Sequence, residues 1–224
     1  MCRLKSGIIL KNRVLVPEYD SHTEMLEELG IKDDYLGASK TFVRVELSPA
    51  DGDVFSDIDT WKLTVDQDIT PEWYDEDTYK PQVVEAVKEW AKDHIHVGID
   101  NLEISAGENH YIKDCKDVRI YGSATVEDIC GSATVKDICG SATVKDICGS
   151  ATVKNIYGSA TVKNAKGTSV IIGSQYGWNK KDALILAENA TFKDCETKTI
   201  YQSGNWKSVK VSEKNGVIKK GKTN

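Results

Sequence analysis

The chain has 224 residues, of which 40% are hydrophobic and 29% charged, and it contains six Cys and four Pro. This composition is typical of folded proteins and excludes collagen-like or wholly disordered chains, while no apolar run approaches the roughly 18–20 residues that a membrane-spanning helix needs. The formal net charge of −6 conceals an uneven distribution, because residues 1–110 carry a net charge of −13 and residues 111–224 carry +7.

This division of charge has three interpretations. The acidic half attracts a positively charged partner, the two halves pair head to tail between chains in a homodimer, or the acidic residues only keep the protein in solution. The sequence by itself leaves all three open.

The N-terminal residues do not have the pattern of a secretory signal, since the first apolar stretch covers only Ile8 to Leu10. The six cysteines include no CxxC pair of the kind that zinc sites use. We therefore expect a cytoplasmic protein with reduced thiols, without a membrane segment, a metal or a cofactor.

Residues 1–98 are predicted to form an acidic α+β domain. Its strands are indicated by alternating apolar and polar residues, and its helices by capping residues and apolar stripes. In chain order we expect a hairpin over 7–16, a short helix between Ser21 and Gly30, paired strands over 41–47 and 61–65, and a long helix in which Pro81 lies at an early position and Val84, Val87, Trp90 and Ala91 face inward.

The most acidic segment of the chain lies between residues 51 and 77. It holds ten Asp and Glu and a single Lys, interleaved with aromatic side chains of the type enriched in protein contact cores. Such a surface imitates nucleic-acid phosphates and would attract proteins that bind DNA or RNA through Lys and Arg; the competing interpretation is a loop that only aids solubility. The predicted partner-binding residues are Asp51, Asp53, Asp57, Asp59, Trp61, Asp66, Asp68, Glu72, Trp73, Tyr74, Asp75, Glu76 and Asp77.

Three histidines lie at and beyond the end of the predicted long helix. His94 and His96, with His110 and either Asp114 or Cys115, have the composition of a metal site, but histidines at the end of a helix also serve its dipole and its solvent contacts. We predict no metal here. The same region supports a second functional hypothesis, a small-ligand-binding protein or hydrolase with its site at the domain junction or on the face of the repeat region.

A nine-residue repeat determines the fold predicted for residues 99–218. The unit Gly-Ser-Ala-Thr-Val-x-Asp/Asn-Ile/Ala-x begins at Gly122, Gly131, Gly140, Gly149 and Gly158. The alternating, β-branched core of each unit predicts a strand, and the Asp or Asn with the following Gly predicts a turn. A helix is excluded because Gly recurs in every unit, and each Gly costs a helix interior about 1 kcal/mol relative to Ala.

A closed coil of a single unit would have almost no interior, because two layers of strands need a core about 10 Å thick. We therefore predict a β-solenoid, or β-helix, with about two units per coil, in which side chains two units apart stack on one another. Cys130 and Cys148 would then lie on one edge, close enough for a disulfide under oxidising conditions, and Cys139 on the other. Residues 219–224 are predicted to be a basic disordered tail.

Degenerate copies of the unit extend the repeat on both sides. In two of them Cys115 and Cys195 replace the isoleucine, so both thiols are expected to be buried. Calcium-binding β-rolls use a related nonapeptide, but here Thr replaces an inner Gly, and Asn155 and Asn164 lack the charge of Asp. The Ser-x-Thr pairs are similar to the hydroxyl arrays of ice-binding solenoids, although two units per coil would split them over two faces.

Four N-terminal segments carry a resemblance: residues 2–10, 19–30, 65–74 and 86–95. Together with the Ser-Ala-Thr-Val repeats, they resemble uncharacterised proteins of gut bacteria and their prophages, in which an acidic N-terminal module precedes a varying number of such repeats. The resemblance implies no activity and no catalytic residue. It implies a prophage setting, in which proteins that inhibit host machinery are frequent.

The functional expectation combines these observations. We expect a non-enzymatic protein-interaction module, a phage or mobile-element inhibitor that binds a host nucleic-acid-binding defence protein through its acidic, nucleic-acid-mimicking N-terminal surface. No catalytic residue is predicted, because the chain has no nucleophile elbow, P-loop, dinucleotide-binding glycine pattern or HExxH helix.

Overall fold

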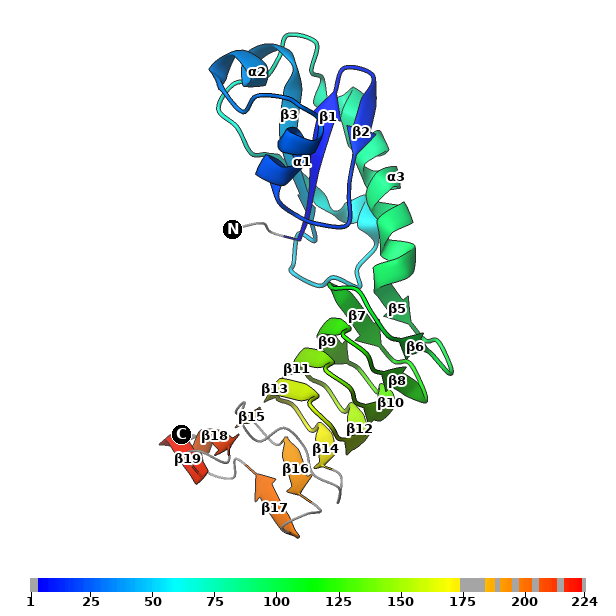
Figure 1. Cartoon of the computed structure of the whole chain (residues 1–224), viewed down its shortest axis with the longest axis vertical. Helices are drawn as coiled ribbons and strands as arrows, with labels where there is room; N and C mark the ends of the chain where they lie inside the picture. The colour runs from blue at the N-terminus through cyan, green and yellow to red at the C-terminus, as the bar shows by residue number, and fades with distance from the viewer. Residues whose placement is uncertain are drawn as a thin grey trace. The chain divides into compact units, whose positions relative to one another are not determined.

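The computed structural model describes residues 4–173, 184–187, 190–194, 198–202, 206–212 and 216–222, so Cys2 and Cys195 lie outside the described residues. The chain divides into two compact units, Met1–Asp93 and His94–Asn224. Figure 1 labels the elements of both units.

The first unit is built on a four-stranded antiparallel sheet. Its strands are β1 (Lys5–Leu10), β2 (Arg13–Leu15), β3 (Phe42–Ser48) and β4 (Lys62–Val65), in the order β2-β1-β3-β4. The predicted hairpin is the β1–β2 pair, and the two strands predicted to share a sheet are β3 and β4. The edges of the sheet are therefore β2 and β4.

Three α-helices and one 3-10 helix complete this unit: α1 (His22–Glu28), α2 (Tyr35–Lys40), η1 (Ile58–Thr60) and α3 (Glu76–His94). The Ser21 hydroxyl caps α1 by accepting a hydrogen bond from the Glu24 N–H at 3.3 Å. Helix α3 begins well before Pro81, because the Asp75 carboxylate accepts from the Thr78 N–H at 2.9 Å and caps the helix there. No apolar stripe in the sequence predicts α2, because its six residues include no buried side chain.

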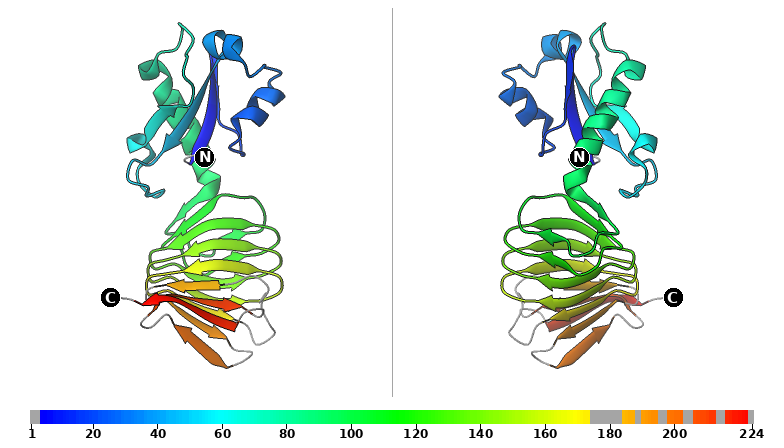
Figure 2. Two further views of the ribbon diagram at one scale, coloured as in Figure 1. Left: turned by 90° about the vertical axis from the view of Figure 1, so that its left-hand side faces the viewer. Right: turned by 90° about the vertical axis from the view of Figure 1, so that its right-hand side faces the viewer.

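Helices cover both faces of this sheet. On one face, Ile8 and Phe42 form a buried cluster with Met25 and Leu26 of α1. The opposite face carries Ile9 and its neighbours, and there α3 packs through its buried apolar stripe, which includes Val83, Val87 and Trp90. Figure 2 shows α1 and α3 on opposite sides of the sheet.

A buried lysine ties three parts of the first unit together. Lys5 of β1 is 1% exposed, and its ammonium contacts the Asp20 carboxylate at 2.8 Å and the Glu18 carbonyl at 3.2 Å. The same nitrogen lies 4.9 Å from the ring centroid of Trp90 on α3, a cation–π geometry. The charge is tolerated because an ionised carboxylate, carbonyl oxygens and an aromatic face replace its water.

The second unit contains a β-solenoid of about five turns over residues 95–194, with strands that alternate between two parallel sheets. One sheet contains β5 (Ile95–Val97), β7 (His110–Lys113), β9 (Thr125–Cys130), β11 (Thr143–Ile147), β13 (Thr161–Ala165) and β15 (Leu184–Ala187). The other contains β6 (Glu103–Ile104), β8 (Val118–Ile120), β10 (Thr134–Ile138), β12 (Thr152–Ile156), β14 (Val170–Gly173) and β16 (Thr191–Asp194). Figure 2 shows the turns stacked in succession.

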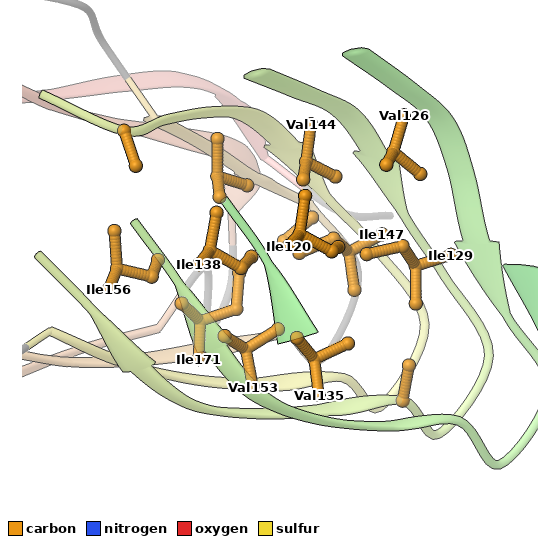
Figure 3. Packing of buried hydrophobic residues seen from close by; sticks show 14 of the residues in the cluster. Ile120, Val126, Ile129, Val135, Ile138, Val144, Ile147, Val153, Ile156 and Ile171 are labelled. Carbon is orange, nitrogen blue, oxygen red and sulfur yellow. The ribbon is translucent and has the colours of Figure 1, made fainter. Parts of the chain in front are cut away.

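The interior of the solenoid is filled by the apolar residues of the repeat. In the pairings between strands, Val135 lies beside Val153 and Val126 beside Val144, so each side chain stacks on the equivalent side chain of the neighbouring strand in its sheet. The Ala, Val and Ile positions of the repeats have exposures of 0–6%. Figure 3 shows valines and isoleucines from the two sheets pointing toward one another, and Cys115 is fully buried in the same cluster, as the sequence predicts.

The repeat glycines allow successive turns to touch backbone to backbone. Gly122, Gly131, Gly140, Gly149, Gly158 and Gly167 all have φ between 63° and 72°, a left-handed conformation that L-residues with a Cβ rarely adopt. A Cβ on Gly149 would lie 2.8 Å from the Gly131 carbonyl oxygen, whereas one on Gly158 would meet nothing closer than 3.5 Å. Glycine is therefore needed at the turn for conformation and, at Gly149, also for space.

The C-terminal end departs from the prediction in two ways. The parallel turns end at Asp194, and β17 (Thr199–Gln202), β18 (Trp206–Ser212) and β19 (Gly216–Lys222) run antiparallel to their neighbours. The solenoid therefore does not continue to residue 218, because an antiparallel strand reverses the direction of winding. Residues 219–222 belong to β19, not to a disordered tail. No helix in the described ranges is both long and apolar enough to cross a membrane.

We expect Gly149→Ala to destabilise the solenoid more than Gly158→Ala. Both variants place an alanine in the left-handed region, which costs roughly 1–2 kcal/mol, but only Gly149→Ala also forces a Cβ against a backbone oxygen. Urea unfolding of the two variants and the wild type measures the difference. Equal losses of stability would show that φ alone, and not the contact between turns, requires glycine.

Candidate functional site

The structure separates the predicted acidic residues into two groups. The first, the β3–β4 loop group, consists of Asp51, Asp53, Asp57 and Asp59; the second, the β4–α3 group, consists of Asp66, Asp68, Glu72, Asp75, Glu76 and Asp77. They lie at opposite ends of β4, because one group precedes this strand and the other follows it. Lys88 binds Asp59 at 2.7 Å, and it lies more than three helical turns beyond Asp75, which is about 20 Å along a helix.

The β3–β4 loop group is largely used by the fold itself. Asp51 accepts a hydrogen bond from the Asp53 N–H at 3.0 Å, and Asp57 accepts one from the Asp59 N–H at 3.1 Å to cap η1. Asp53 likewise accepts from the Phe55 N–H at 3.0 Å. All four carboxylates are exposed. Three of them accept hydrogen bonds within the loop, and the fourth, that of Asp59, attaches the loop to α3 through Lys88.

The β4–α3 group has more carboxylates available to a partner. Asp66 lies 3.3 Å from His22, and Asp75 caps α3. For the remaining four, all of them exposed, the described part of the chain provides no side-chain hydrogen bond or ion pair: Asp68, Glu72, Glu76 and Asp77. Glu76 and Asp77 occupy the first turn of α3, where negative charge interacts favourably with the helix dipole.

The predicted aromatic contact residues have different positions. The prediction that Trp61 contacts a partner is wrong, because its side chain is fully buried and its indole N–H donates to the Ser56 hydroxyl at 3.0 Å. Trp73 and Tyr74 are half-buried beside the β4–α3 group, and Trp73 donates to the Lys40 carbonyl at 2.8 Å. Burial, together with the charges of Glu76 and Asp75, raises the pKa of Tyr74 to about 12. Of the three predicted aromatics, only this pair can contribute to a surface.

Two hollows flank strand β2, and the sequence analysis did not anticipate either. One has a volume of about 270 Å³ and is lined by Arg13, Leu15, Val16, Pro17, Tyr19, Met25, Glu28 and Leu29. The other, of about 480 Å³, is lined by Val14, Gln82, Glu85, Ala86 and Glu89. No local pattern marks these residues, because the hollows arise where helices from distant parts of the sequence pack beside the edge of the sheet.

The face of the solenoid offers a smaller and more polar hollow. It has a volume of about 150 Å³ and is lined by Asn101, Glu103, Asp117, Arg119 and Lys136. Arg119 donates to the Glu103 carboxylate at 3.0 Å, so the strongest charges here satisfy one another. Pockets for small molecules usually have about 300–1,000 Å³ and mostly apolar walls, so this hollow gives little support to the ligand-binding hypothesis.

The three histidines singled out in the sequence come together at the first turn of the solenoid. His94, His96 and His110 are 6%, 8% and 8% exposed. The His110 ring is nearly parallel to that of His94, with centroids 5.3 Å apart, and its Nδ1 lies 3.3 Å from His96 Nε2. The group thus has the shape of a packed stack and not of an open site.

Hydrogen bonds join the rings of this stack to each other and to the backbone. His110 Nε2 lies 3.0 Å from the Ala106 carbonyl, which can only accept, so Nε2 carries a hydrogen, while His110 Nδ1 forms a hydrogen bond with His96 Nε2. Both nitrogens that face each other are therefore committed to a hydrogen bond. Among the described residues, no group of three or more His, Cys, Asp and Glu is placed to hold a metal ion.

Comparison with protein-family models, with curated proteins and with solved structures finds no match to this chain.

The repeat cysteines Cys130 and Cys148 are packed, weakly acidic thiols. Cys130 ends β9 and Cys148 follows the end of the neighbouring strand β11; both are half-buried, and the Cys148 thiol donates to the Asp128 carboxylate at 3.6 Å. Burial raises the pKa of Cys130 to about 12 and that of Cys148 to about 11, with the charge of Asp128 adding to both shifts. Thiols with raised pKa values are poor nucleophiles, so these residues do not form a reactive centre.

We expect Cys148 to react with iodoacetamide at pH 8 about 100 times more slowly in the folded protein than in the unfolded chain. A thiol with a pKa of about 11 holds about a hundredth of the thiolate of one with the ordinary value of 9.0. Because the folded pKa is raised, this thiol contributes stability below pH 9 that is lost as the pH rises toward 11. Peptide mass spectrometry with and without urea measures the rates, and similar rates in both would contradict burial as the cause.

Proposed function

We propose that the protein is a non-enzymatic interaction module whose first unit binds a partner through its acidic surface. The observation that carries this proposal is the β4–α3 group, where four exposed carboxylates lie beside two half-buried aromatic side chains. The first unit as a whole has 11 Lys and Arg against 21 Asp and Glu. Aromatic side chains next to unpaired acidic residues favour a contact surface over solvation alone.

The proposed partner is a host nucleic-acid-binding protein with a basic channel. Such a protein holds DNA or RNA mainly through contacts of Lys and Arg with phosphates, and exposed carboxylates can occupy the same contacts. The prophage setting implied by the sequence resemblance favours a defence protein, which this chain would inhibit as an anti-defence factor. The β4–α3 group is the proposed centre of contact, and the β3–β4 loop group adds to the attracting field at longer range.

We expect Asp68→Asn, Glu72→Gln and Asp77→Asn together to abolish capture of the partner at low salt. Immobilised wild-type chain is incubated with a bacterial lysate, and bound proteins are then released with a duplex DNA or an RNA oligonucleotide. Proteins released by nucleic acid should be retained by the wild type and lost from the triple variant, because competition with phosphate is the signature of mimicry.

The matched control is Glu18→Gln, Glu27→Gln and Asp93→Asn, which removes the same charge from exposed positions of the same unit. It should retain most of the capture. If both triple variants lose capture equally, only net charge matters, and if neither loses it, the acidic surface is not the contact.

For the second unit, we propose that the nonapeptide is the building block of the solenoid, with two blocks in each turn. Strands β9 to β13 start nine residues apart and alternate between the two sheets, and each pairs within its sheet with the equivalent strand two blocks away. Because every block then stacks on the second block before it, an even or an odd number of blocks can be accommodated. The solenoid would serve as a rigid support for the first unit.

Deletion of residues 140–148 tests this proposal. We expect the shortened chain to remain folded, with a β-rich circular dichroism spectrum and cooperative unfolding, because the following blocks rotate by half a turn and find equivalent partners. Deletion of residues 140–157, which removes two blocks, is the control. A chain that tolerates only the longer deletion would show that the complete turn of two blocks is the indivisible unit.

A further inference from the structure

The edge strand β2 presents backbone groups to which another strand can bind. Leu10 and Arg13 flank the two-residue turn of the hairpin and form its first hydrogen-bonded pair, so the next pair, Ile9 and Val14, is not hydrogen-bonded. The N–H and C=O of Val14 therefore point away from β1. Within the described part of the chain, neither group takes part in a backbone hydrogen bond beyond the strand ladders.

Side chains of β2 alternate between the two hollows beside it. Arg13 and Leu15 line the hollow next to α1, here called the α1 pocket, whereas Val14 lines the hollow next to α3, here called the α3 groove. A strand that pairs with β2 continues the same pleat, so its own side chains would enter the α1 pocket and the α3 groove in turn. Edge, pocket and groove thus form one continuous site.

The two hollows differ in chemistry. The α1 pocket is walled by apolar side chains, including Leu15, Met25 and Leu29, and its volume of about 270 Å³ suits one or two side chains better than a whole small molecule. At its rim, Glu28 accepts a hydrogen bond from the Tyr19 hydroxyl at 2.5 Å, so this carboxylate is already occupied.

The α3 groove is acidic. Its walls carry Glu85 and Glu89 one helical turn apart, both exposed, above Val14 and Ala86. Lys92 pairs with Glu89, but the described residues offer no ion pair to Glu85. A cationic side chain with an apolar stem matches this groove, because the stem covers the apolar floor and the head reaches the carboxylates.

We propose that β2 binds an extended segment of a partner protein in which apolar and basic residues alternate, by addition of this segment as a fifth strand of the sheet. Hydrogen bonds to Val14 set the register, apolar residues fill the α1 pocket, and Lys or Arg side chains enter the α3 groove. This site is separate from the two acidic groups and does not depend on their binding a nucleic-acid-binding protein.

The probe is a fluorescein-labelled heptapeptide in which Leu and Lys alternate, Leu-Lys-Leu-Lys-Leu-Lys-Leu, and fluorescence anisotropy measures its binding. The control peptide Leu-Leu-Lys-Lys-Leu-Leu-Lys has the same composition, but no three consecutive residues of it alternate, so as a strand it cannot place Leu on one face and Lys on the other. We expect the control to bind at least tenfold more weakly. Equal binding of the two peptides would overturn the proposal.

Variants of the protein distinguish the contribution of the β2 backbone hydrogen bonds from that of the α3-groove carboxylates. Val14→Pro removes the outward N–H, and proline is tolerated on an edge strand, so the chain should fold and bind the alternating peptide at least tenfold more weakly. Glu85→Lys with Glu89→Lys should weaken binding to a similar extent. The control Glu27→Lys with Asp93→Lys, which changes the net charge equally at exposed positions that line neither hollow, should change it by less than about threefold.

Two further measurements keep the outcome decisive. A peptide with N-methyl groups on its Leu residues, and another with them on its Lys residues, tests the hydrogen bonds on the wild-type protein; one of the two must lose binding, and tight binding by both overturns the proposal. Loss of peptide binding in the Asp68, Glu72 and Asp77 triple variant would instead assign the peptide to the β4–α3 group. If β2 instead pairs with β2 of a second copy, sedimentation will show a dimer that the Val14→Pro substitution dissociates. That result would overturn the assignment of β2 to a partner protein.

Discussion

The close approach of the backbone at the repeat glycines is the constraint on which the second unit depends. A left-handed turn without a Cβ lets one coil lie directly on the one below, and in the sheets that the coils build, neighbouring strands pair equivalent residues, as Val144 with Val126. Once the register is fixed, every other position of the repeat must stack on its own equivalent. The Val and Ile ladders of the interior and the stacking of Cys148 on Cys130 follow from this equivalent register.

The same regularity limits what the solenoid can do chemically. Stacking buries the thiols of Cys130 and Cys148 and raises their pKa values, and it pairs charges on the outer face with one another, as between Arg119 and Glu103. At the first turn, His96 and His110 use their facing nitrogens on each other. Irregular features remain mainly in the first unit, where a short edge strand, two hollows and a group of exposed carboxylates lie on a small sheet.

The acidic residues of the first unit show why composition alone cannot define a binding surface. The carboxylates between residues 51 and 77 are alike in the sequence, yet Asp57 and Asp75 cap helices, Asp59 holds Lys88, and Asp66 lies beside His22. A carboxylate that caps a helix accepts hydrogen bonds from the backbone, which leaves it less able to bind a partner. Trp61, although surrounded by acidic residues in the sequence, is a core residue because it continues the inward side of β4, on which Leu63 is also buried.

Local sequence patterns determined much of this protein: the β1–β2 hairpin, the Ser21 cap of α1, and the nine-residue repeat with its buried Val and Ile. These signals are local, since a turn residue or an alternation acts within a few positions of itself. The tertiary structure alone decided that β17 to β19 reverse direction, that Asp75 and not Pro81 marks the start of α3, and that the exposed acidic residues lie in two groups. It also decided the edge of β2 with its pocket and groove, because these depend on which distant helices pack against which side of a strand, and no residue carries that information by itself.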